Sequence, residues 1–140
     1  MNEFSLVSLI IHAGHHVEHR LETALASVGL SLAKLGALRH LIESGEPLAL
    51  GQLAERIACV KSNVTQLVDR LENDGLVKRV PDPNDRRSVL ALVTDEGRER
   101  YRAGAAALAE AEEELLGDMP ADVREQLSAL LSDFVGAMAR

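Results

Sequence analysis

The stretch SNVTQLVDRLENDGLVKRVPDPNDRRSVLALVT, residues 62–94, changes its hydrophobic period halfway along. Its first half has apolar residues at helical spacing, namely Val64, Leu67, Val68 and Leu71. Gly75 is suited to end this helix. In the second half, residues 76–80 and 88–94 have the composition of strands, with a polar turn between them. The stretch therefore predicts a helix followed directly by a β-hairpin.

The residues on either side of this stretch predict further helices. Before it, helical spacing recurs over residues 4–28, 31–45 and 51–58, with Ser31 as the cap of the second helix and a short strand at 47–50. After it, Thr94 is suited to cap a long helix that runs to about residue 116, and Pro120 to open a last helix. We expect a mainly α fold with a small β-hairpin wing.

Composition favours one helical domain in a reducing compartment. The chain has 140 residues, of which 46% are hydrophobic and only 2% aromatic, so a core of Leu, Val and Ala is expected. The single Cys59 excludes an internal disulfide. The apolar run near the N-terminus is broken by histidines, and no apolar stretch reaches the roughly 20 residues of a membrane span. We expect a cytoplasmic protein with no membrane contact.

The net charge of -7 is spread unevenly. Residues 51–102 hold 10 of the 15 Lys and Arg residues against 9 acidic ones, whereas residues 103–140 hold 2 against 8. Only the contacting surface of a nucleic-acid-binding protein needs positive potential. The acidic total therefore leaves DNA binding open for the middle of the chain.

The order helix, tight turn, capped helix and hairpin is typical of a winged helix-turn-helix. The second helix would enter a major groove of double-stranded DNA, with the candidate contacts Lys61, Ser62, Asn63, Thr65, Gln66 and Arg70. The wing would follow the backbone with its tip in a minor groove, with the candidates Lys78, Arg79, Arg86 and Arg87. Two blander readings stay open, namely an ordinary solvated helix face and a turn in which Asp82 and Asp85 pair with the arginines.

The same residues resemble the core of the MarR (multiple antibiotic resistance regulator) family of bacterial transcription factors. The matching motifs are the L-V-D-R-L-E-x-x-G-L-V-x-R run and the D-x-R-x-x-L-x-L-x-T-x-x-G wing, formed here by Asp85, Arg87, Leu90, Leu92, Thr94 and Gly97. The resemblance is strong over residues 30–100 and elsewhere extends only to the helix layout. It implies a winged-helix homodimer that represses by binding a pseudo-palindrome, with Arg87 as the wing arginine and Asp85 supporting it.

A homodimer also follows from the apolar faces of the flanking helices. Residues 1–28 and 98–139 carry more apolar surface than a chain of this size can easily bury within itself. We expect residues 1–30 and 98–140 to form a dimerisation region, and residues 31–97 to form the DNA-binding domain. Two subunits would then place two recognition helices about one DNA turn apart.

A small-molecule effector is the default expectation, because many MarR relatives bind aromatic acids between the dimer part and the winged helix. The candidates for that role are His15, His16, His19 and Arg39. The i, i+4 pairs His12/His16 and His15/His19 have a spacing that can chelate a metal, so a metal site on the first helix stays open, although no cofactor is expected. Cys59, just before the recognition helix, leaves redox sensing open as well.

Two other classes of function compete with a regulator. A metal hydrolase built on the histidines would need a further ligand type and a general base, and the sequence has neither an HExxH motif nor a nucleophile–base pair. A winged-helix module that binds protein would have no need of the basic wing. We therefore expect no enzyme, but a sequence-specific, ligand-responsive repressor; a metal- or redox-responsive regulator of the same fold is the alternative, with the protein-binding module behind it.

Overall fold

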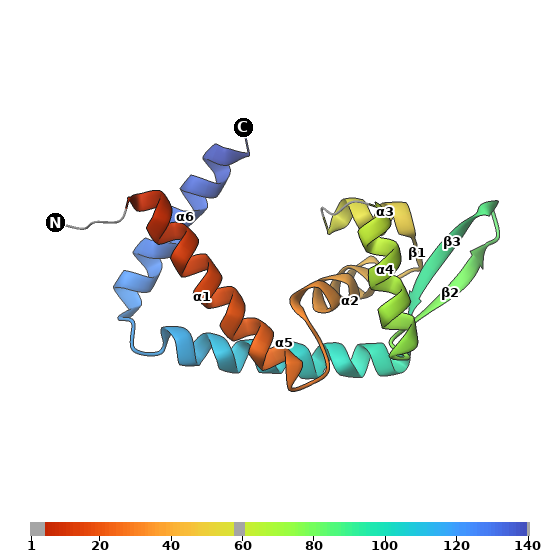
Figure 1. Ribbon diagram of the computed structural model, residues 1–140, viewed down its shortest axis with the longest axis horizontal. Coiled ribbons are helices and arrows are strands. Elements are labelled where there is room, and N and C mark those ends of the chain that lie inside the picture. Colours follow the sequence, from red (N-terminus) through yellow and green to blue (C-terminus); the bar gives the residue numbers. More distant parts are fainter. Residues whose placement is uncertain (1–4, 58–60, 140) are drawn as a thin grey trace.

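A computed structural model describes residues 5–57 and 61–139 of the chain, and for residues 61 and 62 it describes the backbone only. Figure 1 shows the arrangement of the helices and strands. In chain order these elements are α1 (Leu6–Ala26), α2 (Leu32–Ser44), β1 (Leu48–Ala49), α3 (Leu50–Arg56), α4 (Lys61–Asn73), β2 (Val77–Asp82), β3 (Asp85–Val93), α5 (Asp95–Leu116) and α6 (Ala121–Met138). The mainly helical fold with a β wing is confirmed.

The helix ends follow from capping residues that the sequence predicts. The Ser31 side chain accepts the N–H of Lys34, and the Thr94 side chain accepts the N–H of Gly97 at 3.0 Å. Gly75 has a φ of 78°, and the next N–H, that of Leu76, bonds back to the Leu71 carbonyl at 2.9 Å. The sequence also suits Ser62 as the cap of α4, but α4 begins at Lys61, so Ser62 lies inside its first turn.

The two strands of the hairpin are longer than predicted. The sheet has three antiparallel strands in the order β1-β3-β2. β2 runs on to Asp82 and β3 begins at Asp85, so Arg86 and Arg87 lie in β3 and not in the turn. The predicted turn is too long because Pro81 and Asp82 have the composition of a turn. Pro81 instead pairs with Val89 in the edge strand β2, where a missing N–H costs little.

The core lies where α2, α3, α4 and the sheet meet. Its largest fully buried side chains come from each of these elements and from the end of α1, namely Leu25, Leu38, Leu41, Leu53, Val64, Val68, Leu71, Leu76 and Val77. On β3, only Ala91 and Val93 are buried, whereas Val89 on the same face is 40% exposed because the hairpin extends beyond the core. The buried face that helical spacing predicts for α4 is confirmed for Val64, Val68 and Leu71, and Leu67 is half-buried.

α5 connects the winged part of the molecule to the ends of the chain. Figure 1 shows it running from the base of the hairpin to α6, with α1 crossing above it. The Arg20 guanidinium on α1 pairs with the Glu114 carboxylate on α5 at 3.1 Å. The Glu22 carboxylate accepts the N–H of Leu32 at 2.6 Å and so ties α1 to the start of α2.

α1 and α6 leave most of their apolar side chains uncovered. Among the described residues, every large hydrophobic side chain that counts as exposed lies on these two helices, apart from Val89. They are Leu6, Val7, Leu9, Ile11 and Val17 on α1, and Val123, Leu127, Leu130, Leu131, Phe134, Val135 and Met138 on α6. α6 has no buried residue at all over its described length. No helix in the described part of the chain is long and apolar enough to cross a membrane.

Gly97 stands at the junction where the hairpin ends and α5 begins. The Leu76 carbonyl accepts the N–H of Thr94 at 3.0 Å, and the Thr94 hydroxyl donates to the Gly75 carbonyl at 2.7 Å. A Cβ at position 97 would lie 2.2 Å from that same Leu76 oxygen and 2.9 Å from the Val93 side chain. Only glycine allows the three segments to meet this closely.

Gly97→Ala should therefore destabilise the fold by about 1–3 kcal/mol, the usual cost of overpacking. This is informative because alanine is otherwise the better helix former. Gly36→Ala is the matched control, since a Cβ there meets no heavy atom within 4 Å in the middle of α2, and its stability should stay equal or rise. Urea unfolding of both variants measures the difference, and an unchanged free energy of unfolding for Gly97→Ala would contradict the tight junction.

Candidate nucleic-acid interface

Three sides of α4 face different parts of the molecule. At about 100° per residue, Val64, Val68 and Leu71 share the side that faces the core, and all three are fully buried. A second side carries Thr65, Asp69 and Glu72, which lie toward the hairpin. The third side carries polar residues that line a cavity against α2, namely Asn63, Gln66 and Arg70. The i, i+3, i+7 spacing of these three residues predicts that they share one face of the helix, and their common cavity confirms it.

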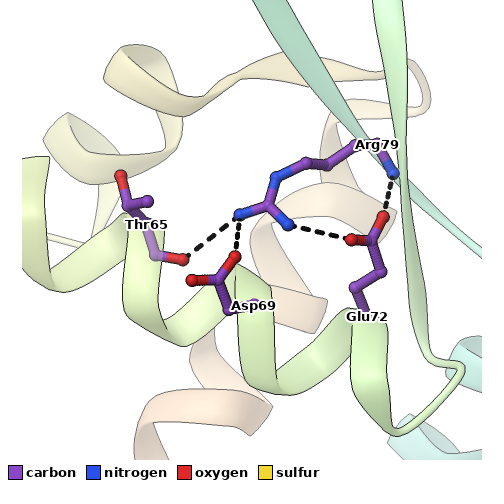
Figure 2. Close-up of polar contacts among 4 residues, drawn as sticks. All are labelled: Thr65, Asp69, Glu72 and Arg79. Carbon is purple, nitrogen blue, oxygen red and sulfur yellow. Dashed lines mark hydrogen bonds and ion pairs between the residues drawn. The ribbon is translucent and has the colours of Figure 1, made fainter.

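Arg79 on β2 fastens the hairpin to α4, as Figure 2 shows. Its guanidinium pairs with the Asp69 carboxylate and, at 2.9 Å, with Glu72 Oε1, and it donates to the Thr65 carbonyl at 3.4 Å. Its backbone N–H donates to the other Glu72 oxygen at 2.9 Å. Arg79 thus contacts three successive turns of the helix.

This network perturbs the ionisation of both partners. The hydrogen bond from the backbone N–H of Arg79, and then those from its guanidinium, lower the pKa of Glu72 below its ordinary value. Burial alone would lower the pKa of Arg79, but its bonds to Asp69 and Glu72 outweigh that effect and raise it. Both groups are therefore held in their charged forms.

Arg79, a predicted DNA contact, has its side chain engaged inside the molecule. It is only 25% exposed, and its donors point to α4. The structure gives it the role of a strut between the wing and the helix. The sequence held a signal for this role, because Asp69 and Glu72 at i, i+3 form an acidic pair on the flank of the helix that faces the strand.

The tip of the hairpin presents Arg86 and Arg87 to solvent. Both side chains are exposed, and no ion pair joins either of them to another residue that the structure describes. The Asp85 carboxylate accepts the backbone N–H of Arg87 at 2.9 Å, and that of Asp82 accepts the N–H of Asn84 at 2.9 Å. The reading in which these aspartates pair with the arginines is therefore wrong. Asp85 does contact Arg87, but it holds the backbone and leaves the guanidinium outward.

The remaining candidates for DNA contact fall into two groups. Lys78, on β2 opposite Leu92, is exposed, as are Asn63, Thr65, Gln66 and Arg70 on α4. The side chains of Lys61 and Ser62 lie outside the described residues, and so does Cys59 as a whole. The DNA-contacting roles of both groups stay predictions.

The candidates for effector binding do not come together. Arg39 lines the cavity between α2 and α4, whereas His15 lines a separate cavity of about 390 Å³ beside Leu9, Ile11 and His12 on α1. His16 and His19 are exposed on α1 and line neither. In the described part of the chain, no three His, Cys, Asp or Glu side chains are placed to hold a metal ion, so the pair His12/His16 has no third ligand there.

Two residues of the α2–α4 cavity were missed as site candidates. They are His40 and Arg56, which line it together with Arg39. Arg56 is the last residue of α3, the helix before α4. Its position beside α2 therefore depends on the angle at which these helices pack. Only the tertiary structure shows that the cavity is lined by cations from three helices.

Comparison with known proteins gives a consistent result. Residues 28–88 match the family model described as MarR family. The HTH-type transcriptional regulator PecS of Dickeya dadantii is 30% identical over 129 residues, which cover 91% of this chain and 74% of that protein. The homoprotocatechuate degradative operon repressor of Escherichia coli is 31% identical over 83 residues, 59% of this chain and 56% of that protein. The chain spans about half the length of several relatives that it matches.

The fold is shared with solved structures. A cysteine-to-serine mutant of MarR from Escherichia coli, complexed with operator DNA, superimposes with a TM-score of 0.79 at 24% identity and covers 92% of each chain. At that level of identity the likeness establishes the fold alone. It confirms the winged helix-turn-helix architecture that the pattern of residues 62–94 predicts.

The substitution Arg79→Ala should raise the pKa of Glu72, but only part of the way to its ordinary value. The guanidinium bonds are lost, whereas the backbone N–H of residue 79, the larger cause of the low pKa, remains. A ¹³C NMR titration of the Glu72 carboxyl measures this. Arg86→Ala is the control on the same hairpin and should leave the Glu72 pKa where it is. An unchanged Glu72 pKa in Arg79→Ala would contradict the strut.

The same contact should make the stability cost of Arg79→Ala depend on pH. A carboxyl whose pKa is lowered by folding adds stability above its unfolded-state pKa, and this contribution is lost as the pH falls through the folded-state value. The difference in urea stability between wild type and Arg79→Ala should therefore be larger at neutral pH than in acid.

Proposed function

The chain belongs to the MarR family of winged helix-turn-helix transcriptional regulators, and on that premise we propose that it is a ligand-responsive repressor that binds a pseudo-palindromic operator as a homodimer. As a DNA-binding regulator of this family, it is not an enzyme. The observation that carries the proposal is the pairing of an exposed polar flank on α4 with two exposed arginines at the tip of a hairpin that Arg79 holds in place.

DNA binding would use the two parts of this surface differently. Asn63, Gln66 and Arg70 are exposed on α4, so they can reach base edges in a major groove. Arg86 and Arg87 can enter a neighbouring minor groove, where the negative potential is concentrated. Figure 1 supports this division, because the hairpin projects beside α4 and away from α5. Lys78 would contact the phosphate backbone.

A second copy of the chain would cover α1 and α6. On α6 the uncovered apolar side chains form a contiguous stripe, in which Val123, Leu127, Leu130, Phe134 and Met138 recur at helical spacing. Monomeric proteins rarely leave such a surface open. Residues 1–30 and 98–140 would then form the dimerisation region and residues 31–97 the DNA-binding domain. A twofold dimer matches a twofold-symmetric operator.

Repression and response to a ligand are proposed from the relatives. The Escherichia coli relative is named as the repressor of an operon for the degradation of homoprotocatechuate, which is an aromatic acid. A small aromatic acid is accordingly the proposed class of effector for this chain. The proposed place of action is the cytoplasm, where a DNA-binding regulator meets its operator.

Arg87→Ala should weaken binding to DNA from the promoter region beside the protein's own gene by about tenfold or more, and should lower the salt dependence by about one phosphate equivalent. The arginine has no ion pair with another described residue, so its loss should leave the fold and the dimer intact. Fluorescence anisotropy at several salt concentrations measures both quantities. Arg102→Ala, which removes the same charge from the exposed side of α5, is the control; equal affinities for the two variants would refute the wing assignment.

Leu130→Glu should convert the dimer to a monomer, because a carboxylate buried in an apolar interface costs several kcal/mol. The winged part should stay folded, since α6 contributes no buried residue to it. Ser132→Glu, on the opposite side of the same helix, should remain a dimer. Sedimentation velocity distinguishes the two, and a dimeric Leu130→Glu protein would rule out this face of α6 as the interface.

A further inference from the structure

Two short segments connect the winged part of the molecule to its flanking helices. Residues 27–31 join α1 to α2, and Thr94 alone joins β3 to α5. A domain that is attached through two segments can still rotate about the line between them, because a few loop residues absorb a hinge motion. The angle between the winged part and the flanking helices is then set by the contacts that cross this joint.

The start of α2 is held from the side of α1. The Glu22 carboxylate on α1 accepts the N–H of Leu32, the first residue of α2, at 2.6 Å. The first N–H groups of a helix have no acceptor within it, and a carboxylate there lies at the positive end of the helix dipole. Leu25 and Leu30 are buried at the same joint, but apolar contact has no preferred direction. The hydrogen bond of Glu22 therefore gives the joint a defined angle.

The start of α2 is also tied to the end of α4. The Lys34 ammonium, in the first turn of α2, pairs with the Asp74 carboxylate at 2.9 Å, and Asp74 directly follows the last residue of α4. A carboxylate is unfavourable at the C-terminus of a helix, where the dipole is negative. The stability of α4 alone therefore gives no reason for an acidic residue at this position, whereas a link to α2 does.

These contacts form a chain from α1 to the recognition helix. The chain runs from Glu22 through the first turn of α2 to Asp74. α5 packs closely against the same place, because a Cβ at Gly104 would lie 2.7 Å from the side chains of both Leu30 and Leu35. The start of α2 is thus the point at which α1, α4 and α5 are joined.

We propose that Glu22, Lys34 and Asp74 are positioning residues for operator binding. By fixing the start of α2 between α1 and α4, they set the separation and angle of the two recognition helices in the dimer. They thereby set the spacing of half-sites that the protein accepts, although none of them is among the proposed DNA contacts. This role rests on the proposed homodimer and its twofold operator, whereas the joint itself lies within one chain.

Operator binding to a series of spacings tests the proposal. Footprinting first locates the site in the promoter region beside the protein's own gene. Fluorescence anisotropy then compares one half-site, the complete site, and complete sites with one base pair added or removed, which shifts a half-site by about 3.4 Å. Glu22→Met and Asp74→Ala should weaken binding to the complete site by about tenfold, because a mobile recognition helix must be ordered as the second half-site binds. Half-site binding should stay unchanged, and the penalty for a wrong spacing should become smaller.

The charges of the variants separate positioning from electrostatics. Asp74→Ala removes a negative charge and Lys34→Met a positive one, so a purely electrostatic effect on DNA binding would have opposite signs. Positioning predicts weaker binding to the complete site for both. Lys34→Arg keeps the ion pair and Glu22→Gln keeps an acceptor oxygen, so both should bind as the wild type does. Glu114→Ala, which breaks an ion pair with Arg20 inside the dimerisation region, is the matched control and should show no loss.

Three results would count against the proposal. Equal losses on the half-site and the complete site would mean that these residues serve only the fold, and unchanged binding to the complete site would mean that they position nothing; either result overturns the role. If the wild-type protein binds the complete site no more tightly than the half-site, the proposed function itself fails, and the operator role of these residues falls with it.

The joint is tested without DNA by pulsed EPR. Nitroxide labels are placed by Glu18→Cys on α1 and Asn84→Cys at the tip of the hairpin, two exposed positions, with Cys59→Ser as background. Dilution with unlabelled protein restricts the measurement to distances within one chain. The distribution of distances should be broader in Glu22→Met than in the wild type, Glu22→Gln or the control Glu114→Ala. Equal widths would overturn the role of Glu22 in the joint, whatever the outcome with DNA.

Discussion

The contact of Arg79 with Asp69 and Glu72 fixes where the wing stands relative to α4. A two-stranded hairpin that extends beyond the core has few apolar contacts to hold it, as the exposure of Val89 shows. Ion pairs at a surface contribute little when they are isolated. Here one guanidinium and one backbone N–H contact three turns of the helix, so the bonds set a geometry more than they add stability.

The division of α4 into three sides explains how one short helix serves several purposes. One side holds the core together and one receives the strut from β2. The third is the wall of a cavity whose other wall belongs to α2. Asn63, Gln66 and Arg70 on this side are exposed as well as cavity-lining, and they are the α4 residues that we propose to contact DNA.

Local features were predictable from the sequence, and contacts between distant segments were not. Ser31, Gly75 and Thr94 cap helices because of their own chemistry, and helical spacing identified the buried side of α4. The extension of β2 to Asp82 was missed because Pro81 breaks a strand only where its N–H is needed. The strut role of Arg79 and the common cavity of Arg39 and Arg56 depend on how helices and strands pack, which spacing along the chain does not encode.

α5 runs unbroken from Asp95 to Leu116 between the winged part and α6. A helix advances about 1.5 Å and turns about 100° with each residue, so its length sets an angle as well as a distance. One inserted residue would swing the hairpin and α4 a quarter of the way round the helix axis. The length of α5 therefore sets the orientation of the winged part relative to α6. Evolution can lengthen the chain in its loops, but within α5 only insertions or deletions close to whole helical turns preserve that orientation.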